Sequence, residues 1–149
     1  MKNANNLDTT LDAVERTNAL AMELLQKERV AIFIVAYNAS QHIENVFKRI
    51  PQFVLENLAQ IYLIDDSSKD DTVDVSSQIN WPSQNAPLKI FRTPVNQGYG
   101  GNQKIGYSYA IKQNFDIVVL LHGDGQYAPE ALPHILAPYA DGVDAVFGS

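Results

Sequence analysis

Hydrophobic positions along the chain form short continuous runs, and the segments between these runs show helical spacing. Continuous runs rich in β-branched residues are typical of strands buried on both faces, as in a parallel sheet. Such runs predict strands at 30–37, 61–65, 88–93, 116–121 and 144–149. Apolar residues three or four positions apart predict helices over about 10–27, 43–50, 71–79, 102–114 and 129–139. This alternation predicts βαβ units, in a mostly parallel sheet with helices on both faces.

The first 28 residues differ from the rest because they are polar with scattered apolar positions. We expect 1–28 to be a helical extension and 29–149 to be an α/β domain. Since the last predicted strand is 144–149, we also expect this domain to be the N-terminal portion of a longer protein, truncated after about the fifth strand. Ser40 is the expected N-cap of one helix, and Asp70 or Asp71 that of the next.

Composition narrows the classes of function. The chain has 149 residues, a net charge of -6 and no cysteine. Disulfides and thiolate metal sites are therefore excluded. The negative charge argues against a nucleic-acid partner bound through a basic surface. No apolar run is long enough to span a bilayer, so we expect a cytoplasmic protein, with peripheral contact at the inner face of a membrane left open.

Polar residues follow the predicted strands at the edge where α/β sheets bind their ligands. These residues, with the small Ala36 and Gly123 among them, are Ala36, Tyr37 and Asn38 at the end of the first strand, Asp65 and Asp66 at the end of the second, Arg92 and the loop 96–102 at the end of the third, and His122, Gly123, Asp124 and Gln126 at the end of the fourth. We expect them to converge on one ligand site.

The residue types at this edge suit a sugar nucleotide. Gly123 and Gly125 leave no side chain beside Asp124, so a bulky group can approach, and the carboxylate can bind a hard divalent cation that holds a diphosphate. Carboxylates after the second strand can accept hydrogen bonds from a ribose or a base. Tyr37 offers a face for stacking. The glycine-rich loop opens a helix whose N-terminus favours anions.

Four segments, "VAYNAS", "LIDDSSKDDT", "NQGYGGNQKIGYSYA" and "LHGDGQYAPE", occur in the order and spacing of the family 2 glycosyltransferases. The chain resembles that family over about residues 30–149, and the polyprenyl-phosphate sugar transferases in particular. The resemblance implies the Rossmann-like, three-layer GT-A fold. It implies an inverting transfer of sugar from a nucleotide-diphosphate sugar to an acceptor such as a polyprenyl phosphate or a cell-surface glycan, assisted by Mg²⁺ or Mn²⁺.

The resemblance also assigns residues. Those implied to bind the nucleotide sugar are Ala36, Tyr37, Asn38, Asp65, Asp66, Asn96, Gly98, Gly101, Lys104, His122, Gly123 and Asp124. Asp124 matches the last acid of the family's Asp-x-Asp motif and is the implied metal ligand, with His122 beside it. The general base of the family is expected beyond residue 149.

Two departures from the family pattern leave alternatives open. His122 replaces the first acid of the motif and brings no negative charge, so metal affinity is expected to be lower or dependent on pH. Ala39 replaces an acid after the first strand. One alternative is a truncated or degenerate nucleotide-binding domain without catalysis. A dinucleotide-binding Rossmann domain is disfavoured because the first turn, AYNAS, lacks the G-x-G-x-x-G pattern.

Overall fold

The computed structural model describes residues 4–148, with side chains described from residue 10 onward. The helices are α1 (Ala4–Lys27), α2 (Ile43–Lys48), α3 (Gln52–Asn57), α4 (Thr72–Ser77), α5 (Gly98–Lys112) and α6 (Leu132–Leu136), with 3₁₀ segments η1 (Pro129–Ala131) and η2 (Ala137–Asp141). The strands are β1 (Val30–Ala36), β2 (Gln60–Asp65), β3 (Leu88–Arg92) and β4 (Ile117–His122).

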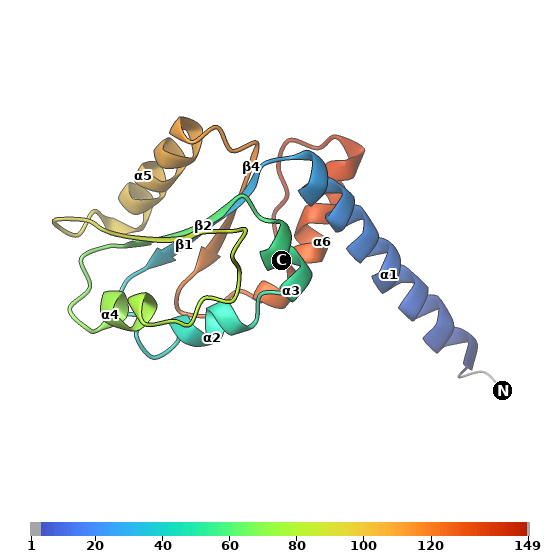
Figure 1. Ribbon diagram of the computed structural model, residues 1–149, viewed down its shortest axis with the longest axis horizontal. Helices are drawn as coiled ribbons and strands as arrows, with labels where there is room; N and C mark the ends of the chain where they lie inside the picture. The colour runs from blue at the N-terminus through green and yellow to red at the C-terminus, as the bar shows by residue number, and fades with distance from the viewer. Residues whose placement is uncertain (1–3, 149) are drawn as a thin grey trace.

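Within the described residues the strands form one sheet in the order β3-β2-β1-β4, and every neighbouring pair is parallel. The central strand β1 is buried along its whole length, which explains its continuous apolar sequence. Helix α5 covers one face of the sheet, and α2, α3 and α4 cover the other (Figure 1). The α/β fold with a parallel sheet and helices on both faces is therefore confirmed.

The core has two parts because successive residues of β1 face opposite sides of the sheet. Ile32 and Ile34 belong to the larger cluster with α1, α2, α3 and α6, whereas Phe33 belongs to the smaller cluster under α5. Helix α5 approaches closely at Gly106, where an added Cβ would lie 2.1 Å from the ring of Phe33. The hydroxyl of Tyr62 donates to the Gly106 carbonyl at 3.0 Å. These contacts fix the height of α5 above the sheet.

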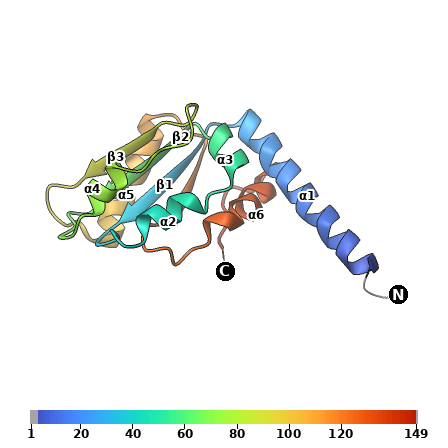
Figure 2. The ribbon, with the colours of Figure 1, turned by 60° about the horizontal axis from the view of Figure 1, so that its bottom comes forward.

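Helix α1 projects away from the domain at its N-terminal end, as Figure 2 shows, while its last turns pack beside α3 and α6. Ala21, Leu24 and Leu25 are buried in the larger core cluster. The helical character expected for the first segment is thus observed over residues 4–27, although its end belongs to the packing of the domain. The division between residues 28 and 29 stays a prediction.

Several local predictions were wrong. Residues 144–148 form no strand, and Ser149 lies outside the described residues. Helix α2 begins at Ile43 after His42, with no side-chain cap, and the Ser40 backbone N–H instead donates to Asp70 Oδ2 at 3.0 Å. The helix predicted over 129–139 is divided into η1, α6 and η2. Pro133 and Pro138 supply no N–H to a continuous helix, which explains the division. Helix α3 was not predicted.

Candidate functional site

A cavity of about 360 Å³ opens at the carboxyl ends of β1, β2 and β4, beside the N-terminus of α5. Its volume falls within the range of small-molecule sites, about 300–1,000 Å³. The lining residues are Val35, Ala36, Tyr37, Asp66, Asn96, Gly98, Tyr99, Asn102, His122, Gly123 and Asp124. Eight of the twelve residues expected at a nucleotide-sugar site therefore lie around one space, as the topology of a parallel sheet requires.

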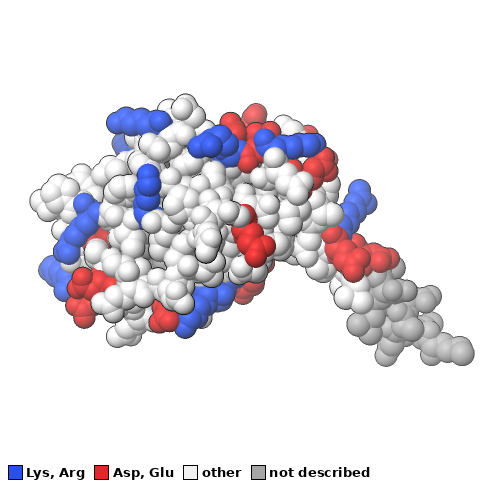
Figure 3. Space-filling model, viewed as in Figure 1, with Lys and Arg blue, Asp and Glu red and all other residues white. Residues whose placement is uncertain are grey.

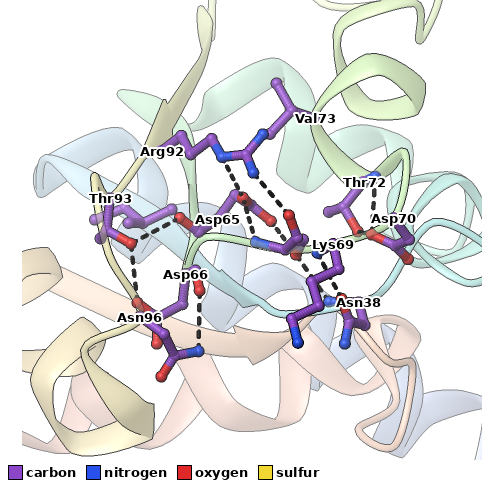
Figure 4. Close-up of polar contacts among 12 residues, drawn as sticks. Asn38, Asp65, Asp66, Lys69, Asp70, Thr72, Val73, Arg92, Thr93 and Asn96 are labelled. Carbon is purple, nitrogen blue, oxygen red and sulfur yellow. Dashed lines mark hydrogen bonds and ion pairs between the residues drawn. The ribbon is translucent and has the colours of Figure 1, made fainter.

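Asp66 forms one wall of the cavity and is only 3% exposed. Its Oδ1 accepts hydrogen bonds from the Gln97 backbone N–H at 2.8 Å and the Thr93 hydroxyl at 3.0 Å. Its backbone carbonyl accepts a bond from Asn96 Nδ2 at 3.1 Å (Figure 4). These bonds hold the carboxylate in a fixed position and attach the loop before α5 to the end of β2.

The N-terminus of α5 forms the adjoining wall. Gly98 has a φ of 71°, a conformation that favours glycine, and its N–H donates to Asn96 Oδ1 at 3.0 Å. The first turn of this helix carries no acidic side chain. The helix thus brings no negative charge of its own to its N-terminus, where Asp66 accepts the Gln97 N–H, and the positive end of its dipole favours an anionic ligand.

His122 at the end of β4 makes a hydrogen bond with Tyr99 from the first turn of α5, with the hydroxyl 2.8 Å from Nε2. The ring of Tyr127 meets the imidazole edge-on at 4.5 Å between centroids. Burial, together with the nearby phenols of Tyr127 and Tyr107, raises the pKa of the Tyr99 hydroxyl, which is therefore protonated at neutral pH. When that hydroxyl donates, the imidazole carries its proton on Nδ1.

Asp124 is exposed and lies in the turn that follows His122. Its Oδ1 accepts a bond from the Gln126 backbone N–H at 3.0 Å, and Gly125 adopts a φ of 78°. Gly123 packs closely on β1, since an added Cβ would lie 3.2 Å from both Ala36 Cβ and the Val35 carbonyl oxygen. A larger residue at position 123 would thus be crowded against β1, and the glycine also leaves access to the carboxylate.

The other four predicted site residues lie outside the cavity lining. Asp65 is fully buried and accepts bonds from the Ser68 N–H and hydroxyl, with the Arg92 Nε 3.5 Å away. Asn38 Oδ1 accepts a bond from the Lys69 N–H at 2.9 Å, as Figure 4 shows. These two residues hold the loops after β1 and β2 together. Gly101 and Lys104 lie further along α5, and Lys104 is exposed.

Three lining residues, Val35, Tyr99 and Asn102, were not among the twelve assigned to the nucleotide sugar, although Tyr99 and Asn102 belong to the loop 96–102 that was expected at this edge. Tyr99 and Asn102 lie in a segment read as a glycine-rich loop, because three glycines argue against a helix start at residue 98. Once the helix is known to begin there, both residues fall in its first turns, beside the cavity. Asn102 could have been found from helical spacing, because it lies four and eight positions before Gly106 and Ala110, the other buried residues of α5, and is the only one of the three with a polar side chain.

A divalent cation would have to be held by a small set of groups. Within residues 4–148, no three acidic, histidine or cysteine side chains gather as a preformed metal site. Asp124 leaves Oδ2 with no hydrogen bond from the described residues, and a carboxylate of this kind fits Mg²⁺, which commonly takes one or two carboxylates with substrate phosphates. His122 could bind the same ion only if Nε2 gave up its hydrogen bond with Tyr99 or if Nδ1 were the ligand atom.

The family model described as "Glycosyl transferase family 2" matches residues 31–149. The chain belongs to family 2 of the glycosyl transferases. The match covers the whole cavity lining and all four described strands except Val30, the first residue of β1.

Curated relatives agree with this assignment. The chain is 26% identical over 121 residues to a dolichol-phosphate mannosyltransferase of Pyrococcus furiosus, covering 81% of this chain and 33% of the relative. It is 26% identical to an undecaprenyl-phosphate mannosyltransferase of Micrococcus luteus, covering 81% and 48%. It is 28% identical to a UDP-N-acetylglucosamine–dolichyl-phosphate N-acetylglucosaminyltransferase of Methanococcus voltae, covering 80% and 51%. The chain thus spans about a third to a half of these relatives.

A solved structure of S. aureus TarS, residues 1–349, superposes with a TM-score of 0.53 at 17% sequence identity, over 76% of this chain and 32% of that one. This similarity supports the GT-A type of α/β fold. No helix in residues 4–148 is both long enough and apolar enough to cross a membrane.

Proposed function

We propose that this chain supplies the donor site of a glycosyltransferase that moves a sugar from a nucleotide-diphosphate sugar to a polyprenyl phosphate. The observation that carries the proposal is the single cavity in which Asp66, the start of α5 and the His122–Asp124 turn meet. Membership of family 2 makes a nucleotide sugar the first ligand to consider for such a cavity.

The cavity has two chemically different ends. Asp66 and Asn102 lie where α5 meets β2, and they offer hydrogen-bond acceptors suited to a nucleoside. His122 ends β4 and Asp124 lies in the turn after it, beside the positive end of α5. We place the base and ribose at the first end, with Tyr37 stacking against them at the exposed rim, and the diphosphate at the second.

Transfer would proceed by an inverting displacement. An oxygen of the acceptor phosphate attacks C1 of the sugar while the bond from C1 to the diphosphate oxygen breaks and its electron pair leaves with the diphosphate. Asp124 would hold a Mg²⁺ or Mn²⁺ ion, which supplies positive charge for the leaving diphosphate when bound. Tyr99 holds the His122 imidazole beside that position through its hydrogen bond.

The acceptor class rests on the relatives, whose names specify dolichol, dolichyl or undecaprenyl phosphate. A polyprenyl phosphate lies in a membrane, so the enzyme would act in the cytoplasm at the inner face of one. On the face seen in Figure 3, lysine and arginine side chains are interspersed with acidic ones around the rim. A glycan acceptor at the cell surface is the alternative within the same chemistry.

Calorimetric titration of the chain with GDP-, UDP- and dTDP-sugars, each with and without Mn²⁺, tests the donor site. Binding of one nucleotide sugar that strengthens with Mn²⁺ is the expected result. A folded chain that binds none of them would contradict the proposal. Binding without transfer to a polyprenyl phosphate would instead favour a nucleotide-binding domain that does not catalyse on its own.

A further inference from the structure

Asn102 has an unusual position for a polar side chain. It lies on α5, is 2% exposed and lines the cavity. Its Nδ2 donates to the Ile64 carbonyl at 2.9 Å, but its Oδ1 has no hydrogen-bond partner among the described residues. A buried amide oxygen without a partner is destabilising, so such an atom in a ligand cavity indicates a donor that a ligand brings.

The orientation of this amide is fixed by chemistry. If the group were turned around, Oδ1 would face the Ile64 carbonyl oxygen, and two acceptors would repel each other. The donor of Asn102 is therefore used on the chain itself. The atom that remains for the cavity is an acceptor.

Asp66 provides a second acceptor at the same end of the cavity. Its Oδ1 is occupied by Thr93 and Gln97, whereas Oδ2 receives no hydrogen bond from the described residues. Both side chains are tied to the end of β2, because Asn102 bonds to Ile64 and Asp66 lies two residues further along. The nearby Asn96 Nδ2 is already used on the Asp66 carbonyl.

We propose that Asp66 and Asn102 form a paired acceptor that selects guanine as the base of the nucleotide donor. The inference rests on the function proposed above. Guanine presents two neighbouring donors, N1–H and the 2-amino group, to such a pair. Uracil and thymine present one N–H between two carbonyls, so one carbonyl would face the Asn102 oxygen. Adenine and cytosine place a ring acceptor beside their amino group. A GDP-sugar is therefore the donor class.

The test compares GDP, inosine diphosphate and UDP in calorimetric titrations of the chain with Mn²⁺ present. Inosine lacks only the 2-amino group of guanosine, so it isolates one hydrogen bond. We expect GDP to bind at least about tenfold tighter than either of the others, since a missing donor leaves a buried acceptor unpaired. In Asn102→Ala the preference for GDP over inosine diphosphate should fall to about twofold or less.

Ser108→Ala is the matched control, because Ser108 is an exposed polar residue on the same helix and lies outside the cavity lining. It should keep the wild-type preference. If the wild-type chain binds inosine diphosphate or UDP as tightly as GDP, the paired acceptor is wrong even though the donor site stands. That comparison needs no variant, so it decides the matter even where Asn102→Ala fails to fold. If the folded wild-type chain binds no nucleotide, the proposed function itself fails.

Discussion

The hydroxyl of Tyr99 lies 2.8 Å from Nε2 of His122 and so joins the first turn of α5 to the end of β4. The imidazole occupies the position where the family motif has its first acid. The site therefore carries one negative charge less than that motif would give. It has instead a hydrogen bond between the start of one element and the end of the next, since α5 directly precedes β4 in the chain.

Tyr99→Phe should remove this bond while keeping the aromatic ring. We expect a loss of about 0.5–1.5 kcal/mol in the free energy of unfolding, the usual contribution of one hydrogen bond. The ¹⁵N shifts of the His122 ring nitrogens should differ between the wild-type chain and the variant, because Nε2 loses its partner. His42 and His134 give the internal reference, and unchanged His122 shifts in the variant would contradict the bond.

Asp124→Asn should weaken Mn²⁺-dependent binding of the donor by about tenfold or more, because the amide keeps the bond from Gln126 but loses the negative charge. Titration with and without Mn²⁺ measures this. Asp144→Asn, an exposed acid outside the cavity lining, is the control and should bind as the wild type does. A folded Asp124→Asn variant with unchanged affinity would remove Asp124 from the metal site.

Asp65 and Asp66 are neighbours in sequence but should respond differently to the same change. Asp65→Asn should lower the free energy of unfolding by about 1–2 kcal/mol, because it weakens the bonds to Ser68 and Arg92. Its effect on nucleotide affinity should be small. Asp66→Asn should weaken nucleotide binding by about tenfold. Denaturant unfolding and titration of both variants separate the two roles, and equal effects on affinity would contradict the assignment.

Gly106→Ala should destabilise the fold by about 1–3 kcal/mol, because the added methyl group overlaps the ring of Phe33. Gly100→Ala, on the same helix with no atom within 4 Å of the added Cβ, should be neutral or stabilising by up to about 1 kcal/mol. Urea unfolding measures both. A tolerated Gly106→Ala would mean that α5 can move away from the sheet.

Asp70 gives a dependence on pH. Burial acts to raise the pKa of this carboxyl, but hydrogen bonds from Thr72 and Ser40 outweigh it and lower the pKa to about 2. The stabilisation is therefore present above the unfolded-state pKa of about 4 and is lost as pH falls towards about 2. Asp70→Asn should cost about 1 kcal/mol near neutral pH, after allowance for solvent screening, and nothing near about pH 2. Urea unfolding across this pH range measures the difference in free energy of unfolding between the wild-type chain and the variant, with Asp144→Asn as control. A difference that stayed constant with pH would contradict the role given to Asp70.

The strands were predictable because burial on both faces leaves a continuous apolar sequence, and the four strands begin and end within one residue of the predicted bounds. The segment 144–148 has the same kind of sequence but no strand. A strand exists through pairing with a neighbour, and sequence pattern alone does not supply one.

The start of α5 could not be predicted because it depends on a distant residue. Helix propensity disfavours Gly98, Gly100 and Gly101, yet the turn before them is fixed by the bond from the Gln97 N–H to Asp66. The same dependence explains why Tyr99 was expected in a loop and why neither Tyr99 nor Asn102 was assigned individually to the ligand. The site residues at strand ends could be predicted from the topology of the sheet. Asp65 and Asn38 lie next to the lining residues Asp66 and Tyr37 in sequence but hold loops in place, and the sequence does not distinguish such adjacent positions.

The packing of α1 bears on where the N-terminal boundary of the domain is placed. The family match begins at residue 31, but the apolar side chains of Ala21, Leu24 and Leu25 are already part of the core. A chain cut at the start of the match would leave the surfaces of α3 and α6 under α1 open to water. The region matched by the family model is thus smaller than the packed core of this chain, and a boundary drawn at residue 31 would cut through that core.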